Sequence, residues 1–400
     1  MKPDHNGEFV KLDLADPDDQ RTTEGRAVKV ELRPPATARP ASIRCPAWGP
    51  KREWMPKAFA QMAPAISSIG VYILRNCEIR GLAIAYLDGQ LVNAPDLIPS
   101  YVEHSLSNIN ISSFDATLPI REVDGQSVVF VSNAYLVYGH WLLDILPRLW
   151  IATQLYHVDA AANFILPNGT PSFALDIMSE YFGIDAFMSF DIERETLLIE
   201  EAIMPSLPHN DHFFHPIMNE FVEWLLVHPS VIAAETKCNS APELIYITRK
   251  GFRDVSTSYK RSISNEDQVL ELVESLGFSV VSPEQLSWSE QIFLFSRALI
   301  IAGEDGSGLH NAVFSPGNAS VICLNPVNQV QVTIAALRNQ QITVLCSHDG
   351  DGEVKTEQEV DLTRLRLAIS AAAKSAGNSI PPEVRERLII GRSIGVIPLD

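Results

Sequence analysis

Short apolar runs and amphipathic helical patterns alternate most regularly in the second half of the chain. Residues 244–248, 278–281 and 298–302 are apolar runs of the length typical of buried strands. A helical pattern over residues 264–276 lies between the first two. Strands that alternate with helices of this length predict parallel βαβ units. We therefore expect a Rossmann-like C-terminal domain, to which we assign residues 236–350.

Signals at the ends of two helices support this pattern. Ser264 can cap the first helix, and Gly277 can stop it. The sequence Ser-Trp-Ser-Glu at 287–290 has the form of a capping box, and it opens a second helix that runs to Arg297. Both helices thus end directly before a predicted strand.

The first half of the chain alternates less regularly. Apolar runs at 70–74 and 81–87 predict two strands of a small β region, and another strand is predicted at 126–132. A helical pattern over residues 138–149 follows this strand. We assign residues 51–235 to an N-terminal α/β domain.

The two ends of the chain differ in composition from these domains. Residues 1–50 are polar, acidic and rich in proline, which predicts a flexible N-terminal arm. Residues 351–400 hold a helical pattern at 359–373 and a polar tail, and we assign them to a C-terminal helical extension. A length of 400 residues fits two domains more readily than one, because single cores seldom exceed about 250–300 residues.

Charge and cysteine content argue against several classes of protein. A net charge of −18 argues against binding of nucleic acid and against docking on anionic lipid through general basicity. Five scattered cysteines without a Cys-x-x-Cys spacing fit a reducing compartment better than a disulfide framework. No basic stretch followed by an apolar one marks a secretory signal, and no apolar run approaches the ~18 residues of a membrane span. These features predict a cytoplasmic protein.

The glycine-rich sequence at 303–311, Gly-Glu-Asp-Gly-Ser-Gly-Leu-His-Asn, is the strongest candidate for a ligand-binding loop. It follows a predicted strand and leads into a helical pattern, where flexible backbone and helix N–H groups suit a phosphate. Its glycines do not fit the GxGxxG dinucleotide fingerprint, and no Gly-Lys-Ser/Thr of a Walker A loop follows. Because open α/β sheets bind ligands at the carboxyl ends of strands, we favour a ligand-binding role over a tight structural turn.

A basic cluster begins directly after the strand at 244–248. Five cations lie there within thirteen residues of a strongly acidic chain: Arg249, Lys250, Arg253, Lys260 and Arg261. The planar guanidinium suits a diphosphate, and lysine adds a point charge. We slightly favour phosphate binding over the alternative of a solvated basic loop.

His140 and Asp144 are four residues apart on the predicted helix and share one face. A carboxylate beside a histidine can orient the ring and raise its basicity, as a general base requires. Pro147 should end or kink this helix near Leu146. From the spacing alone, a core helix with a hydrogen-bonded histidine is the favoured interpretation.

Three histidines at a spacing of three, His209, His212 and His215, raise the alternative of a zinc site. Their segment is aromatic, bounded by prolines and without a defined helical face, whereas metal ligation needs converging side chains. We favour an interdomain loop over a metal site.

Together these segments resemble glycosyltransferase family 61, the capsular polysaccharide biosynthesis type. The likeness covers roughly residues 120–345. It rests on the segments 140–149, 245–249, 261–266 and 278–311.

The resemblance implies a GT-B-like α/β fold, in which two Rossmann-like domains face each other across a cleft. It implies an inverting hexosyl- or pentosyltransferase that needs no metal and no cofactor. The sugar would pass from a nucleotide-sugar donor to a glycan or lipid-linked acceptor in polysaccharide biosynthesis. In this scheme His140 is the catalytic base and Asp144 orients it. The expected donor-binding residues in the C-terminal domain are Arg249, Arg261, Asn265, Glu266, Asp305, Gly306, Ser307, Gly308, His310 and Asn311.

The chain departs from the family pattern at one position. Asp305 stands where the family usually has a histidine, and His310 follows five residues later. A non-catalytic sugar- or nucleotide-binding subunit of a polysaccharide assembly system therefore remains the alternative. A sugar-nucleotide-modifying enzyme such as an epimerase is disfavoured, because the dinucleotide fingerprint is absent. We expect activity at the cytoplasmic face of the membrane, and both peripheral membrane association and a homodimer stay open.

Overall fold

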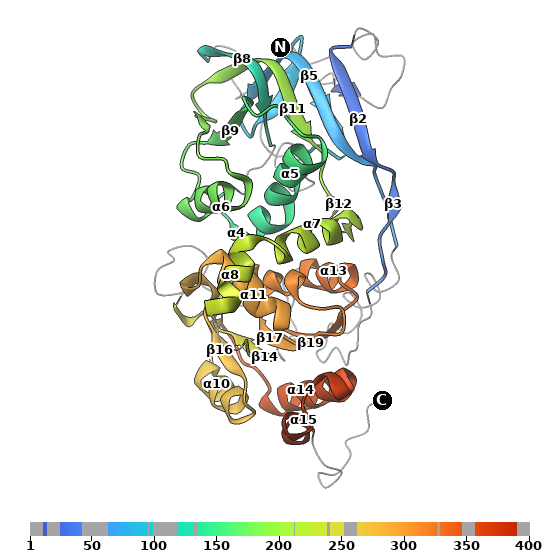
Figure 1. Cartoon of the computed structure of the whole chain (residues 1–400), viewed down its shortest axis with the longest axis vertical. Helices are drawn as coiled ribbons and strands as arrows, with labels where there is room; N and C mark the ends of the chain where they lie inside the picture. Colours follow the sequence, from blue (N-terminus) through green and yellow to red (C-terminus); the bar gives the residue numbers. More distant parts are fainter. Residues whose placement is uncertain are drawn as a thin grey trace. The chain divides into compact units, whose positions relative to one another are not determined.

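The chain divides into two compact units in a computed structural model (Figure 1). Unit 1 comprises Met1–Thr37 and Pro64–Met218, and unit 2 comprises Ala38–Ala63 and Asn219–Asp400. The structure describes residues 11–13, 25–41, 63–94, 96–98, 118–130, 135–211, 213–237, 241–251, 262–325, 329–345 and 357–389.

The described part of unit 1 is built on a mixed nine-stranded sheet. Its order is β1-β7-β6-β5-β11-β8-β9-β10, and β2 also pairs with β5. The bounds are β1 Lys11–Asp13, β2 Ala27–Arg33, β5 Ile69–Arg80, β6 Ile84–Leu87, β7 Gln90–Asn93, β8 Ile120–Val128, β9 Asn163–Pro167, β10 Met188–Phe190 and β11 Thr196–Pro205.

Only part of this sheet is parallel. Strands β11, β8, β9 and β10 pair in parallel, whereas β5, β6 and β7 form an antiparallel meander. Short turns containing Gly81 and Gly89 join the strands of the meander, and such short connections can link only antiparallel neighbours. The small β region with a hairpin-like turn that the sequence predicts here is found, whereas this mixed sheet does not confirm the Rossmann-like N-terminal domain that the resemblance implies.

Part of the predicted N-terminal arm is a strand of this sheet. Strand β2 pairs antiparallel with β5, so that Val28 lies opposite Ile73 and Val30 opposite Val71. A side chain at position 70 of β5 would overlap the backbone carbonyl of Val30, so the glycine there permits the close approach of β2. Strand β2 was not predicted from the sequence, because the acidic composition of residues 1–50 conceals a local alternation of apolar and polar residues.

A continuous helical segment over residues 138–155 packs against β11 and β5. It consists of α4 Tyr138–His140, the π-helical η2 Trp141–Ile145, α5 Leu146–Trp150 and the π-helical η3 Ile151–Leu155. Of the two effects predicted for Pro147, an end or a kink near Leu146, the end is not found, because the helical segment continues to Leu155. The wide π-helical turn before the proline relieves the clash between its ring and the preceding carbonyls.

The sheet of unit 2 is fully parallel over its five described strands, in the order β16-β14-β17-β18-β19. The bounds are β14 Leu244–Ile247, β16 Ser279–Val281, β17 Ile300–Glu304, β18 Ser320–Leu324 and β19 Gln341–Leu345. With β14 as the first strand this is the doubly wound order 2-1-3-4-5, which reverses direction between β14 and β17. The Rossmann-like sheet predicted for this part of the chain is confirmed.

Helices cover the sheet of unit 2. They include α10 Glu266–Ser275, α11 Trp288–Arg297, α13 Val330–Leu337 and α14 Leu362–Ala376. The capping box of Ser287 and Glu290 is confirmed at the start of α11, whereas Asn265 rather than Ser264 precedes α10. Helix α14 contacts β17, β18 and β19, so this part of the predicted C-terminal extension belongs to the packed unit. Among the described residues, no helix is long and apolar enough to cross a membrane.

Candidate functional site

A carboxylate held between two histidines is the main polar feature of the helical segment in unit 1. Nδ1 of His140 lies 2.6 Å from Oδ2 of Asp144, and Nε2 of His209 lies 2.7 Å from Oδ1 of the same carboxylate. The side chains of Asp144 and His209 are 2% and 3% exposed, whereas that of His140 is 28% exposed. Only His140 of the three can therefore meet a ligand directly.

Two opposing influences set the charge of Asp144. Burial is the largest and raises its pKa, but hydrogen bonds and charge interactions with His140 and His209 outweigh it and hold the pKa below the ordinary range. An ionised carboxylate can only accept hydrogen bonds. Nδ1 of His140 must therefore donate to it, and in the neutral ring Nε2 then carries a lone pair that can accept a proton.

The second histidine comes from a short hairpin far along the chain. His209 begins β12, His209–Asn210, which pairs with β13, Phe213–Phe214. Its ring also meets the ring of Phe214 edge-on, with the centroids 5.7 Å apart.

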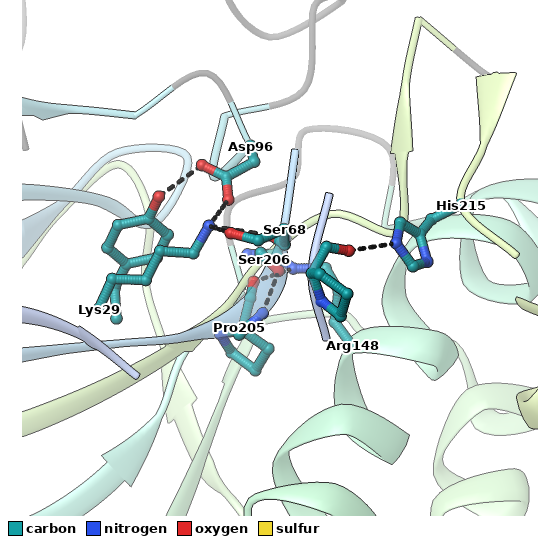
Figure 2. Close-up of polar contacts among 10 residues, drawn as sticks. Lys29, Ser68, Asp96, Arg148, Pro205, Ser206 and His215 are labelled. Atoms are coloured by element: carbon teal, nitrogen blue, oxygen red, sulfur yellow. Dashed lines mark hydrogen bonds and ion pairs between the residues drawn. The ribbon is translucent and has the colours of Figure 1, made fainter. Parts of the chain in front are cut away.

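The segment that carries His209 is fixed by hydrogen bonds from three directions, and Figure 2 labels Arg148, Pro205 and Ser206, which take part in two of them. Nε of Arg148 donates to the carbonyl of Pro205 at 2.8 Å, from the same helical segment that carries Asp144. Gly70 and Ser206 exchange two hydrogen bonds, from Gly70 N to Ser206 Oγ and from Ser206 N to Gly70 O. The N–H of Leu207 donates to the carbonyl of Asp96 at 2.6 Å.

The next support is a partly buried ion pair, also drawn in Figure 2. Nζ of Lys29 on β2 lies 2.6 Å from Oδ2 of Asp96 and donates to the carbonyl of Ser68 at 2.8 Å. The hydroxyl of Tyr72 donates to the other carboxylate oxygen of Asp96 at 2.5 Å. Strand β2 is thereby tied to the same loop that holds the segment before His209.

In unit 2, the glycine-rich loop and the start of the basic cluster follow the two strands where the sheet order reverses. Strand β17 ends at Glu304, and the short helix α12, Ser307–His310, begins after Gly306. Nη1 of Arg249, just beyond β14, lies 3.4 Å from the carbonyl of Asp305 and 3.9 Å from Oε2 of Glu304. Arg249 and the glycine loop, two of the predicted donor-binding elements, are thus neighbours.

Two glycines allow this loop its shape. Gly303 lies against Ile247 of β14, where an added Cβ would stand 3.0 Å from the Cβ of that residue. Gly306 has a φ of +146°, a conformation that side chains rarely adopt. The loop backbone can therefore turn sharply at the end of β17.

The other predicted donor-binding residues take different places. Asn265 bonds through its amide to the backbone of Val360 in both directions, and Glu266 accepts a hydrogen bond from Thr248 at 2.8 Å. Asn311 donates to Gln291 at 2.8 Å from a buried position. Gly308 lies in α12 with Ser307, and His310 is its last residue and is buried. Arg261 lies outside the described residues.

The histidine segment does not form a metal site among the residues that the structure describes. His209 bonds to Asp144, whereas Nε2 of His215 lies 3.1 Å from the carbonyl of Pro34, and His212 is outside the described residues. His209 is therefore the residue whose role sequence reasoning missed. The sequence signal at His209 is its place among three histidines spaced three residues apart. That pattern suggested a metal site, whereas the structure pairs His209 with Asp144.

Comparison with known proteins shows that part of the chain is similar to one protein family. A search of curated proteins gave no match. Residues 138–322 match the glycosyltransferase 61 family model. The matched region starts at the helical segment of His140 and Asp144, includes His209 and Arg249, and ends in β18. This region is thus similar to the glycosyltransferase 61 family, and the similarity indicates a glycosyltransferase.

Proposed function

We propose that the chain is an inverting glycosyltransferase of the GT-B type that acts in polysaccharide biosynthesis. It would move a hexose or pentose from a nucleotide-sugar donor to a hydroxyl of a glycan or lipid-linked acceptor. The observation that carries the proposal is the hydrogen bond from His140 to the buried carboxylate of Asp144. It gives a partly exposed imidazole the orientation that a general base needs.

Inversion by a single displacement needs one such base. Nε2 of His140 takes the proton of the acceptor hydroxyl while the oxygen attacks the anomeric carbon of the donor sugar. The bond from this carbon to the diphosphate breaks, and its electron pair leaves with the nucleoside diphosphate. The charge of Asp144 stabilises the imidazolium that forms.

The donor side of the proposal rests on the parallel sheet of unit 2. In doubly wound sheets, ligands bind beyond the carboxyl ends of the strands at which the order reverses. Arg249 and the loop 303–311 follow these two strands, β14 and β17. The guanidinium and the loop N–H groups suit the charge of a departing diphosphate, so the proposal requires neither a metal nor another cofactor.

The first experiment measures thermal unfolding with a panel of nucleoside diphosphates and nucleotide sugars, with and without divalent metal. A donor at ~100 times its dissociation constant should add ~2.7 kcal/mol to the free energy of unfolding. A shift that needs no metal would support the proposal and name the donor. No shift with any sugar nucleotide would contradict it, and a shift only with metal would contradict the metal-free mechanism.

The second experiment separates an enzyme from a non-catalytic binding subunit. His140→Ala should lower turnover by ~10²–10⁴-fold, because a general base is removed, and donor affinity should stay unchanged. His157→Asn, at an exposed histidine beyond the same helical segment, is the matched control and should keep full turnover. Donor binding without turnover in the unaltered protein would instead favour the binding subunit, the alternative raised by Asp305.

A further inference from the structure

The proposed base and its carboxylate leave one buried titratable group without a role. His209 is 3% exposed, and its ring approaches the carboxylate oxygen of Asp144 that His140 does not use. The carboxylate therefore has one imidazole on each oxygen, at 2.6 and 2.7 Å.

We propose that His209 is a positioning residue for the base, which it controls through Asp144. Nε2–H of His209 donates to Oδ1 and fixes the plane of the carboxylate, so that Oδ2 faces Nδ1 of His140. The proposal rests on the proposed function for its catalytic meaning, but the coupling of the three side chains can be tested without turnover.

The chemistry depends on which nitrogen of His140 holds the proton. An ionised Asp144 accepts from Nδ1–H and leaves the lone pair on Nε2. If Asp144 were protonated, its hydroxyl would donate to Nδ1, the proton of the neutral ring would move to Nε2, and that nitrogen could no longer act as the base. Whatever keeps Asp144 ionised and in plane therefore sets the reactive tautomer of His140.

His209 supplies part of that control. Burial opposes the charge on Asp144, and the interactions with His140 and His209 overcome it. Both rings are titratable groups that act on the carboxylate, one from its own helical segment and one from β12. Without His209, Oδ1 would be a buried carboxylate oxygen that has lost its strong donor, which favours protonation or rotation of the group.

The fixed segment before His209 explains how the ring holds its place. Arg148 follows Asp144 by one turn and donates to the carbonyl of Pro205. The helical segment is therefore hydrogen-bonded to the chain four residues before His209. Ser206, labelled in Figure 2, exchanges hydrogen bonds with Gly70, and Leu207 donates to the carbonyl of Asp96. The helix and the sheet thus fix both partners of the bond between Asp144 and His209, as accurate positioning of a base requires.

The test compares two substitutions at one position. His209→Phe keeps a planar ring but removes the donor, whereas His209→Gln can place an amide N–H where Nε2 stood. We expect the Phe variant to lower kcat by up to ~100-fold with the KM for the donor unchanged, and the Gln variant to restore much of the loss. His215→Gln is the matched control, because this buried histidine lies in the same segment but bonds to Pro34 instead of Asp144.

Nitrogen-15 NMR of the labelled histidines gives a readout without turnover. The ring of His140, assigned by its loss in His140→Gln, should be in the Nδ1–H tautomer in the unaltered protein and in the His215→Gln control. It should shift toward Nε2–H in His209→Phe. If that variant does not fold, His209→Asn takes its place, because its amide is one carbon shorter than that of Gln and falls short of Asp144.

The outcomes separate this inference from the proposed function. An unchanged kcat and an unchanged tautomer in His209→Phe would overturn the role of His209, even where His140→Ala is inactive. Equal losses in His209→Gln, His209→Phe and His215→Gln would overturn it as well, because they would show general loosening of the segment. Full turnover in His140→Ala would refute the proposed base, and the NMR shift would still decide the coupling.

Discussion

Asp144 is a charged side chain in a position where charge is costly. Burial alone would favour the neutral acid, yet two imidazole donors keep the carboxylate ionised. The hydrogen bond between His140 and Asp144 helps to keep the carboxylate ionised, and it also fixes the tautomer of His140. At the scale of single residues, stability and the proposed chemistry thus depend on the same hydrogen bonds.

Asp144→Asn should destabilise the protein by ~2–3 kcal/mol at neutral pH, because a buried amide presents N–H to one of the two ring N–H groups. The pKa of Asp144 is lowered on folding, so the stability that the ion contributes is present above its unfolded pKa of ~3.9 and is lost as the pH falls below it. Urea unfolding should show the difference between the two proteins shrinking from pH 5 to pH 3.

The control for this substitution is Asp176→Asn, at an exposed carboxylate on α6, Ser172–Phe182. It should change the free energy of unfolding by no more than ~0.5 kcal/mol. An Asp144→Asn protein as stable as the control, or a difference that grows below pH 5, would show that Asp144 is not held as an ion.

The residues of the site differ in how far the sequence could predict them. His140 and Asp144 are four apart, and helical geometry alone brings them together. His209 lies 65 residues from Asp144, and their contact depends on where a two-residue strand leaves the sheet. No periodic pattern in the sequence predicts where the chain places this strand. The sequence therefore showed only that His209 is one of three closely spaced histidines.

At the scale of elements, the pairing of β2 with β5 depends on how closely their backbones can approach each other. Strand β2 lies against β5 at Gly70, where any side chain would meet the carbonyl of Val30. The same residue exchanges two hydrogen bonds with Ser206, on the way to His209. Gly70 thus permits the pairing of β2 and also forms hydrogen bonds with the segment before the hairpin β12–β13.

Gly70→Ala should therefore destabilise unit 1 by ~1–3 kcal/mol, because the added methyl group must push β2 away from β5. Gly251→Ala is the control, since its Cβ would meet the flexible end of Glu284 at 3.1 Å instead of backbone. Urea unfolding measures both. Hydrogen exchange should also show faster exchange over residues 27–33 in Gly70→Ala, and equal exchange there in both variants would contradict the pairing.

Local signals predicted some elements well and others poorly. The capping box of α11 and the stop at Gly277 depend on neighbouring residues, and both are found where expected. The effect of Pro147 depends on whether the helix can widen, which the proline itself does not determine. The π-helical turn of η2 lets the helix continue and brings Arg148 to the carbonyl of Pro205.

At the scale of the whole molecule, the two units have different architectures. The parallel sheet of unit 2 follows from regular alternation and was predictable, whereas the mixed sheet of unit 1 combines a meander with parallel strands. The proposed base belongs to unit 1, and the proposed diphosphate site belongs to unit 2. Ligand binding and the charged centre should therefore stabilise separate parts of the protein.

Calorimetry can test this division. We expect two unfolding transitions. A bound nucleoside diphosphate should raise the midpoint temperature of one, and Asp144→Asn should lower the midpoint temperature of the other. The Asp176→Asn protein without ligand gives the reference trace. A single transition, or two effects on the same transition, would contradict the assignment of the two sites to independently stable units.

The pairing of β2 with β5 also governs how short this chain can be made. Composition suggests that the acidic start is dispensable, but removal of the residues up to Thr37 would take β2 away from positions 69–74 of β5. The backbone groups released there would form an open, apolar sheet edge, which is a template for a strand of another molecule. Shortening the chain in this way would therefore make the protein prone to association through this edge, although every residue of the proposed site would still be present.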